Sequence, residues 1–144
     1  MDFGSGFRIS GSGMRAQQVR MNTISSNIAN VNTVRTPEGG PYRRKDVVLE
    51  ATPDAKTFGE VLNHGAESLN RVQVTDIHVD TSAPNLRHEP DHPDADENGM
   101  VAYPNVNLME EMANMIQATR AYEANVSALN ATKDMAMTAL NIGD

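Results

Sequence analysis

The sequence contains no cysteine and no tryptophan, and only six other aromatic residues among 144. Without cysteine, disulfide bonds and thiolate chemistry are excluded, and zinc would have only histidine and carboxylate ligands. Leu, Ile, Val and Phe together number 28, a share at which a charged chain approaches the composition of disordered proteins. We therefore expect a sparse core, and a chain that completes its burial against copies of itself or against partners.

Long apolar runs are also missing. No segment approaches the ~20 apolar residues of a membrane span, and the N-terminal MDFGSGFRIS has no basic region followed by an apolar stretch. We therefore expect no direct membrane insertion and no cleaved signal peptide. If the protein leaves the cytosol, it uses another export route.

Charge is distributed unevenly along the chain. The formal net charge is −7, with a net +5 on residues 1–45 and a net −12 on residues 46–144. Three of the N-terminal arginines lie singly along a predicted helix, whereas binding to phosphates depends on clustered positive charge. The pattern argues against nucleic-acid binding and favours attraction between the two ends of the chain.

Apolar spacing predicts an N-terminal helix from about residue 7 to residue 31. Apolar side chains recur at alternating steps of three and four, which aligns them in one row on an α-helix. Four glycines near its start predict weak or kinked first turns, since an interior glycine costs about 1 kcal/mol relative to alanine. TPEGGP at 36–41 marks the break that follows. The predicted packing row comprises Met14, Met21, Ile24, Ile28 and Val31.

A second, longer helix is predicted from about Asn107 to Asn141. Asn107 is a good N-cap, and Glu110 three residues later completes a capping-box pattern. Such a helix would be about 50 Å long, which exceeds the diameter of a small domain. Its predicted packing row comprises Leu108, Met112, Met115, Tyr122, Val126, Leu129 and Leu140.

The middle of the chain is rich in β-branched residues. RKDVVLEA at 44–51 and RVQVTDIHVD at 71–80 are predicted strands, and a change of parity in the second indicates a bulge near Thr75 or Asp76. Residues 52–69 could be a loop or a helical turn. The predicted fold is α+β, with two long terminal helices that pack as a coiled-coil-like layer and a small β-rich middle. Its three parts are an N-terminal helix in 1–33, an extended, β-rich segment in 34–104 and a C-terminal helix in 105–144.

One acidic stretch, HEPDHPDADENG at 88–99, is a candidate metal site. Asp94, Asp96, Asn98 and Gly99 match the opening of a calcium-binding loop. The twelfth position is Asn105 rather than a carboxylate, and two prolines exclude an entering helix. A proline-punctuated turn leading into the C-terminal helix is the better interpretation, with a weaker ion site as the alternative.

Nothing else in the sequence indicates catalysis. There is no G-x-S-x-G motif, and the four histidines are scattered. We predict no catalytic, cofactor-binding or metal-binding residues.

The run SSNIANVNT resembles the S-x-N-x-A-N-x-x-T motif of the bacterial flagellar axial proteins, the family of rod, hook and hook-associated subunits. PNVNLMEEM, RAYEAN and TPEGGPYRRKDVV are similar to the C-type proximal rod subunits within that family. The residues that match the motif are Ser26, Asn27, Ala29, Asn30 and Thr33.

This resemblance implies a structural subunit of the proximal rod of the flagellar basal body, not an enzyme. It implies export without signal cleavage by the flagellar type III apparatus and polymerisation in the periplasm through the terminal helices. The implied partners are copies of the chain, other rod subunits, the inner-membrane ring and rod-base adaptor proteins. Another axial subunit, a helical-hairpin export adaptor and, more remotely, a metal-dependent enzyme remain as alternatives.

Overall fold

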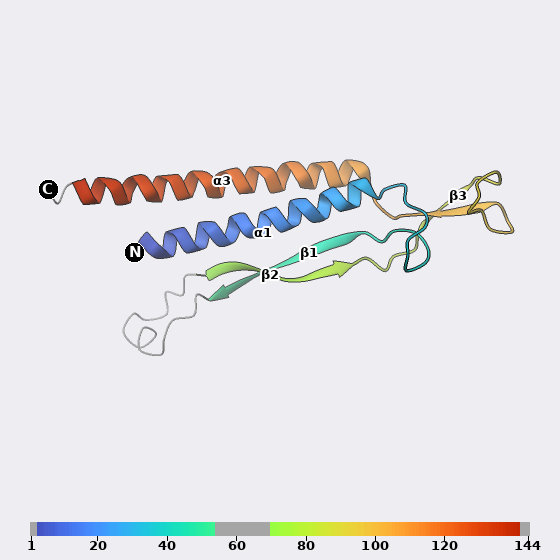
Figure 1. Ribbon diagram of the computed structural model, residues 1–144, viewed down its shortest axis with the longest axis horizontal. Coiled ribbons are helices and arrows are strands. Elements are labelled where there is room, and N and C mark those ends of the chain that lie inside the picture. The colour runs from blue at the N-terminus through green and yellow to red at the C-terminus, as the bar shows by residue number, and fades with distance from the viewer. Residues whose placement is uncertain (1–2, 54–69, 142–144) are drawn as a thin grey trace.

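The computed structural model describes residues 3–53 and 70–141, and it is dominated by two long antiparallel helices (Figure 1). Helix α1 is Phe3–Ala29 and helix α3 is Leu108–Asn141. They pack side by side, so that the start of α1 and the end of α3 lie at the same end of the molecule. The expected fold class is confirmed: two long terminal helices packed together, with small antiparallel β segments between them in sequence.

Helix α1 begins four residues earlier than its apolar spacing predicts, and it is continuous through its glycines. The glycines therefore do not interrupt the helix, and weakness of its first turns stays a prediction. A Cβ placed on Gly6 would lie 3.2 Å from Cγ2 of Thr132, and one on Gly13 would lie 2.7 Å from Oδ1 of Asn125. These glycines allow α1 to approach α3 closely, and the resulting packing offsets their low helix propensity.

The C-terminal end of α1 is stabilised by the side chain of the next residue. The Asn30 side-chain amide donates to the carbonyl of Ser26 at 2.9 Å, and the N–H of Thr33 donates to the carbonyl of Asn30 at 3.0 Å. Asparagine often ends helices in a left-handed conformation. Among the described residues only Gly39, Gly40 and Gly99 have a positive φ, so Asn30 follows the end of α1 without adopting that conformation.

The start of α3 agrees with the predicted N-cap. Oδ1 of Asn107 accepts from the backbone N–H groups of Met109 at 3.1 Å and Glu110 at 3.4 Å. Glu110 and Glu111 place negative charge in the first turn, where the helix dipole favours it. The sequence therefore located this helix boundary to within one residue.

Strands β1 (Lys45–Pro53) and β2 (Asn70–Val79) form an antiparallel pair. Val48 lies opposite Asp76 and Leu49 opposite Val74, so Thr75 is the extra residue of a β-bulge, as the change of parity predicts. The pair packs against α1, and Figure 1 shows it on the side away from α3. Helix α1 is therefore the middle of three layers. The predicted loop or turn at 52–69 lies almost wholly outside the described residues.

Side chains occupy several backbone groups of this two-stranded sheet. The N–H groups of Val47 and Ile77 donate to the carboxylates of the preceding residues, Asp46 at 2.9 Å and Asp76 at 2.8 Å. On β2, the N–H of Val72 donates to the Ser12 hydroxyl of α1 at 3.1 Å. These groups are satisfied without another strand.

A second antiparallel pair, β3 (Asn85–His88) and β4 (Met100–Tyr103), extends beyond the end of the helix pair where α3 begins (Figure 1). The sequence pattern places this region in the β-rich middle but does not predict the two strands. The acidic stretch at 88–99 ends β3 and forms the whole of their connection.

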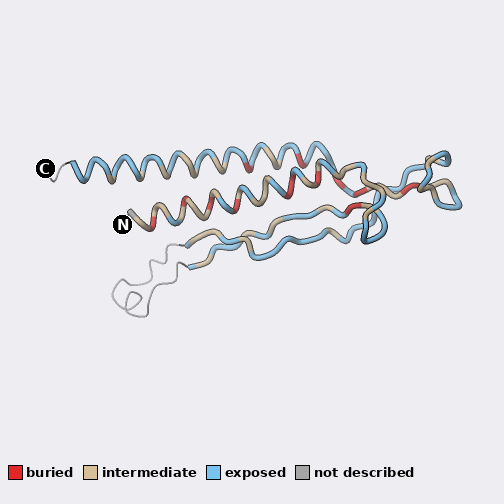
Figure 2. Tube along the Cα trace, in the orientation of Figure 1, coloured by how far each residue is buried: buried red, intermediate tan, exposed pale blue. Residues whose placement is uncertain are grey.

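The core is small, as the composition predicts. In Figure 2 the buried residues follow α1 and the first turns of α3, while most of α3 is exposed. The accessible surface is 10076 Å², against about 7,200 Å² for a compact protein of this mass. No helix in the described ranges is long and apolar enough to cross a membrane. The buried apolar residues are Ala16, Ile24, Tyr42, Val101, Val106 and Ala118.

Candidate functional site

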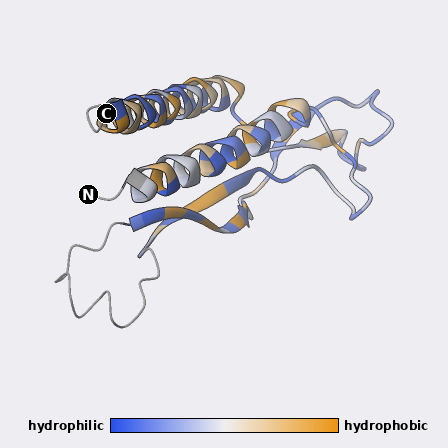
Figure 3. Ribbon diagram, turned by 60° about the vertical axis from the view of Figure 1, so that its left-hand side comes forward, coloured by the Kyte–Doolittle hydropathy of each residue, from blue (hydrophilic) through white to orange (hydrophobic). Residues whose placement is uncertain are grey.

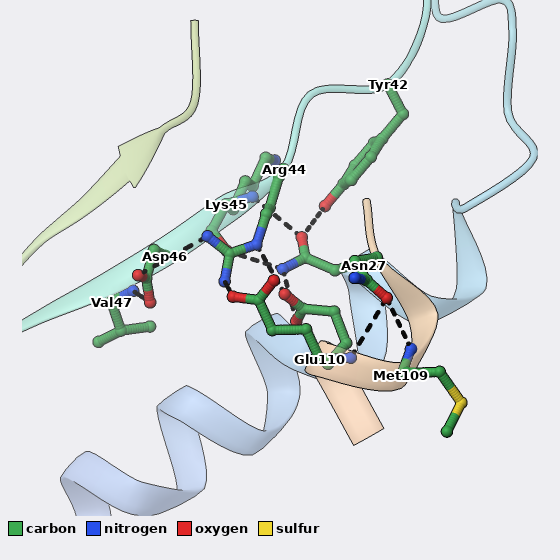
Figure 4. Close-up of polar contacts among 10 residues, drawn as sticks. Asn27, Tyr42, Arg44, Lys45, Asp46, Val47, Met109 and Glu110 are labelled. Atoms are coloured by element: carbon green, nitrogen blue, oxygen red, sulfur yellow. Dashed lines mark hydrogen bonds and ion pairs between the residues drawn. The ribbon is translucent and has the colours of Figure 1, made fainter. Parts of the chain in front are cut away.

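Asn27 is the centre of a polar junction where α1, the start of β1 and α3 meet (Figure 4). It is fully buried. Its Oδ1 accepts from the Tyr42 hydroxyl at 2.9 Å and from the Lys45 N–H at 3.0 Å. Its amide nitrogen donates to the Lys45 carbonyl at 2.8 Å and to Oε2 of Glu111 at 3.1 Å. All the hydrogen-bonding capacity of this side chain is therefore used.

Glu111 is the second fully buried polar side chain of this junction, with 1% of its surface exposed. Nε of Arg44 approaches its Oε1 at 2.6 Å, a charge-assisted hydrogen bond. Partial burial alone would lower the pKa of Arg44. The hydrogen bond and charge of Glu111, together with the nearby Asp46 and Glu110, instead raise that pKa above its ordinary value. The guanidinium remains charged and balances a buried carboxylate.

The structure gives most of the motif residues a role within the chain. Ser26 lies with its hydroxyl 3.3 Å from the Tyr42 hydroxyl, beside Asn27. Thr33 accepts the Tyr42 N–H on its carbonyl at 3.0 Å, and its hydroxyl donates to Oδ1 of Asn30 at 3.2 Å. The motif therefore holds the chain reversal between α1 and β1. Ala29 is exposed, and nothing in this chain explains its place in the motif; as an assembly motif these residues stay a prediction.

Sequence reasoning missed Tyr42, Arg44 and Glu111 as members of this junction. Glu111 carried one usable signal, because it lies four residues before Met115 and seven before Ala118, at heptad spacing. A charged residue in that row requires a buried partner. The spacing could not identify Arg44 as this partner, because Arg44 lies 67 residues away from Glu111 in the chain.

The row of α3 that faces α1 differs in part from the predicted row. Met115, Tyr122 and Leu129 are half-buried, as members of both rows. The same face also carries small or polar side chains. Glu111 and Ala118 are buried, and Asn125 and Thr132 are half-buried. Close approach of the glycines on α1 favours small residues there.

Several predicted packing residues of α3 consequently remain on the surface. Met112 is 49% and Leu140 is 75% exposed, and Leu108 is exposed as well, while Val126 is half-buried. Hydrophobic and hydrophilic residues alternate along α3 in Figure 3. We call the exposed apolar residues of this helix the outer stripe: Leu108, Met109, Met112, Ile116, Met135, Met137 and Leu140.

The predicted row on α1 is more enclosed. Ile24 is buried, and Met21 contacts α3 through its sulfur, 3.6 Å from the Thr119 hydroxyl. Met14 and Ile28 are half-buried. Val31 is half-buried as well but lies beyond the end of the helix, in the turn that follows. Packing of either row against other subunits stays a prediction.

The acidic connection at 88–99 is held together by its own carboxylates. Oδ1 of Asp96 accepts the N–H groups of Asn98 and Met100, both at 2.8 Å. Asp94 forms an ion pair with Arg35 at 2.5 Å. Gly99 has a φ of 72°, the left-handed conformation that the turn interpretation anticipates.

These contacts make the acidic residues parts of a turn. Within residues 3–53 and 70–141, no group of three or more His, Asp or Glu is placed to hold a metal. The two groups of charged and polar side chains described above connect segments of the chain to one another. Chemically, the arrangement holds segments of one chain together through hydrogen bonds and ion pairs.

Comparison with known proteins identifies both ends of the chain. Residues 7–35 match the family model described as flagella basal body rod protein. Residues 97–142 match the model described as flagellar basal body rod FlgEFG protein C-terminal. The two matches include the helix pair, and the first contains Asn27 while the second contains Glu111.

Curated relatives extend the similarity over nearly the whole chain. The flagellar basal-body rod protein FlgC of Bacillus subtilis is 43% identical, over 94% of this chain and 94% of its own length. That of Borreliella burgdorferi is 41% identical, over 96% and 95%, and that of Salmonella typhimurium is 39% identical, over 95% of each. With this identity, this coverage and both terminal models matched, the chain belongs to the FlgC family of flagellar basal-body rod proteins.

Proposed function

We propose that this rod-family chain is a structural subunit that polymerises through its terminal helices into the proximal part of the flagellar drive shaft, which transmits motor torque. The observation that carries the proposal is the outer stripe of α3 on a chain that belongs to the FlgC family. Leu108, Met109, Met112 and Ile116 fall within about three turns and on about one third of the helix circumference. An exposed apolar cluster of this kind on a soluble monomer is typical of an interaction surface.

The geometry favours an open assembly. The outer stripe lies on α3, whereas α1 is covered by α3 on one side and by the β1–β2 pair on the other. A surface that meets a different surface on its neighbour extends into a helical polymer instead of closing into a dimer. We therefore expect the stripe to pack on non-equivalent faces of copies of the chain and of other rod subunits.

Ordering of the chain should be incomplete before assembly. The junction end of the helix pair holds Ile24, Asn27 and Glu111, all buried. At the other end Met135, Met137 and Leu140 are exposed, so that end buries little apolar surface to offset its ordering entropy. We expect the last turns of α3, from Met135 onward, to become fully helical only when neighbours cover them.

The same proposal includes the place where the subunit works. A rod subunit of the basal body would occupy the periplasm after export, without signal cleavage, by the flagellar type III apparatus. The inner-membrane ring and rod-base adaptor proteins are its proposed neighbours at the base. Family membership supports the assembly with other rod subunits in general, and the finer partners are proposals.

The test introduces charge into the outer stripe. In a strain that lacks the native gene, the double variant M112E/I116E should be produced but should abolish swimming in soft agar and be absent from isolated basal bodies. Both positions are exposed in the single chain, so the purified variant should keep the circular dichroism spectrum of the wild type.

A matched control is Q117E/N130E, which adds two glutamates at exposed polar positions of the same helix. It should swim nearly normally. Normal swimming by M112E/I116E would show that the outer stripe is not part of the assembly surface. A wild-type chain that is monomeric, absent from basal bodies and fully helical in isolation would instead support the export-adaptor alternative.

A further inference from the structure

The contacts between α1 and α3 repeat every seven residues. Gly6 faces Thr132, and Gly13, seven residues later, faces Asn125, seven residues earlier on the antiparallel helix. Two further steps of seven along each helix lead to Asn27 and Glu111, which are hydrogen-bonded. One heptad register therefore accounts for these three contacts.

Most of this interface would tolerate a shift by one repeat. A slip of seven residues would place Gly6 opposite Asn125 instead of Thr132, again a glycine opposite a short polar side chain. Heptad interfaces built from similar residues are prone to such slips unless one position specifies the pairing. The glycine contacts allow close approach but do not select the register.

We propose that Asn27 and Glu111 are the residues that fix the register of α1 against α3. They are the two polar side chains at this interface that are almost completely buried, at 0% and 1% exposed. After a slip in one direction Asn27 would face Ala118, and after a slip in the other it would face Pro104, before α3 begins. Either slip breaks the hydrogen bond between the buried Asn27 amide and the buried Glu111 carboxylate. Leaving these buried groups unpaired costs more stability than the loss of one ordinary contact.

The two residues also connect the register to the rest of the chain. Asn27 bonds both backbone groups of Lys45, which fixes α1 relative to the first residue of β1. Arg44, the preceding residue, bonds Glu111 and so fixes α3 relative to the same point. A slip toward Arg20 would offer Glu111 another cation but would break the bonds to Asn27 and Arg44 together. These are positioning residues whose role is to hold one helix alignment.

Disulfide trapping in the purified full-length chain tests the proposal. Because the sequence has no cysteine, every disulfide comes from introduced residues. The pair G6C/T132C reports the native register, while G6C/N125C and G6C/A139C report slips of one heptad in either direction. A slip moves the partner about 10 Å along the helix axis, beyond the reach of a disulfide.

In the otherwise native chain the 6–132 disulfide should form in at least about tenfold excess over the other two, since a slip costs a buried hydrogen-bonded pair. In an N27L/E111L background Arg44 keeps the nearby carboxylates of Asp46 and Glu110, and the three disulfides should form in comparable amounts. The control N130L/E123L carries the same substitutions at exposed positions of α3 and should preserve the excess.

Retention of the excess in N27L/E111L would overturn the proposal, as would equal trapping of all three pairs in the native chain. Products are assigned by peptide mass under dilute conditions, so that disulfides within one chain are counted separately from those between chains. The readout is the ratio of the native disulfide to the slipped ones. A general loss of stability would not favour the specific slipped pairs. Motility defects in M112E/I116E would not change this result, so assembly and register are tested independently.

Discussion

Two glycines in α1, Gly11 and Gly13, lie in the same helix but in opposite environments. A Cβ on Gly11 would meet nothing within 4 Å, whereas one on Gly13 would meet the Asn125 side chain at 2.7 Å. That side chain is itself held by a 2.8 Å hydrogen bond to the Ala121 carbonyl, so it cannot move away without losing the bond. The same substitution should therefore have opposite signs at the two positions.

The variant G11A should stabilise the chain by about 1 kcal/mol, because alanine is the better helix former and no contact opposes it. G13A should gain nothing or be destabilising, since the added methyl must displace Asn125. Denaturant unfolding followed at 222 nm measures both variants. The double variant G13A/N125A removes the obstruction and should recover stability relative to G13A; equal stability of G11A and G13A would show that the close approach is absent.

At the scale of elements, the β3–β4 pair carries an ionisable contact that predicts pH dependence. The Tyr103 hydroxyl donates to Oε2 of Glu89 at 2.9 Å. This hydrogen bond, with desolvation and the negative charge of Glu89, raises the pKa of Tyr103 above its ordinary value. The contribution to folding is complete below the unfolded-state pKa of tyrosine, near 10, and is lost as the pH rises through the higher folded value.

Difference titration at 295 nm between the wild type and Y103F isolates this tyrosine. Its midpoint should lie above that of a free tyrosine, and E89Q should move it down because the charge is gone. E97Q, in the same acidic connection, should leave it in place. A midpoint unaffected by E89Q would show that the contact does not form in solution.

The element boundaries also show what the sequence could and could not predict. Asn107 as N-cap and Thr75 as bulge were accessible because capping and strand parity are local effects. The start of α1 was placed too late because its glycines are compensated by contacts with Thr132 and Asn125, more than a hundred residues away. Helix propensity is a local property and does not include the stabilisation that comes from tertiary packing.

The same distinction applies to the candidate site. The motif around Asn27 was visible in the sequence, but its partners Tyr42, Arg44 and Glu111 come from three separate places in the chain. The α3 row was predicted from apolar spacing, whereas in the structure small and polar residues share the face toward α1 with Met115, Tyr122 and Leu129, and Met112 is exposed. An apolar row predicts burial without stating which molecule supplies it.

At the scale of the whole molecule, the chain is an elongated three-layer structure with its polar junction at one end of the helix pair and the exposed end of α3 at the other. Interactions that specify the fold of one chain and those proposed to join chains therefore lie on different surfaces. The register pair lies within the subunit, and the outer stripe is the surface proposed to act between subunits.

Asp46 and Asp76, whose carboxylates accept the N–H groups of Val47 and Ile77, should limit aggregation of the protein at high concentration. A sheet of only two strands has two open edges, and open edges recruit further strands into amyloid-like aggregates. Asp46 and Asp76 occupy donors that an incoming strand would need and add negative charge beside them. D46A/D76A should therefore form thioflavin-T-positive fibrils faster than the wild type, while E50A/E123A, with the same loss of charge at exposed positions, should not. In the monomer these aspartates would prevent polymerisation through the sheet. The helices would stay available for the proposed assembly.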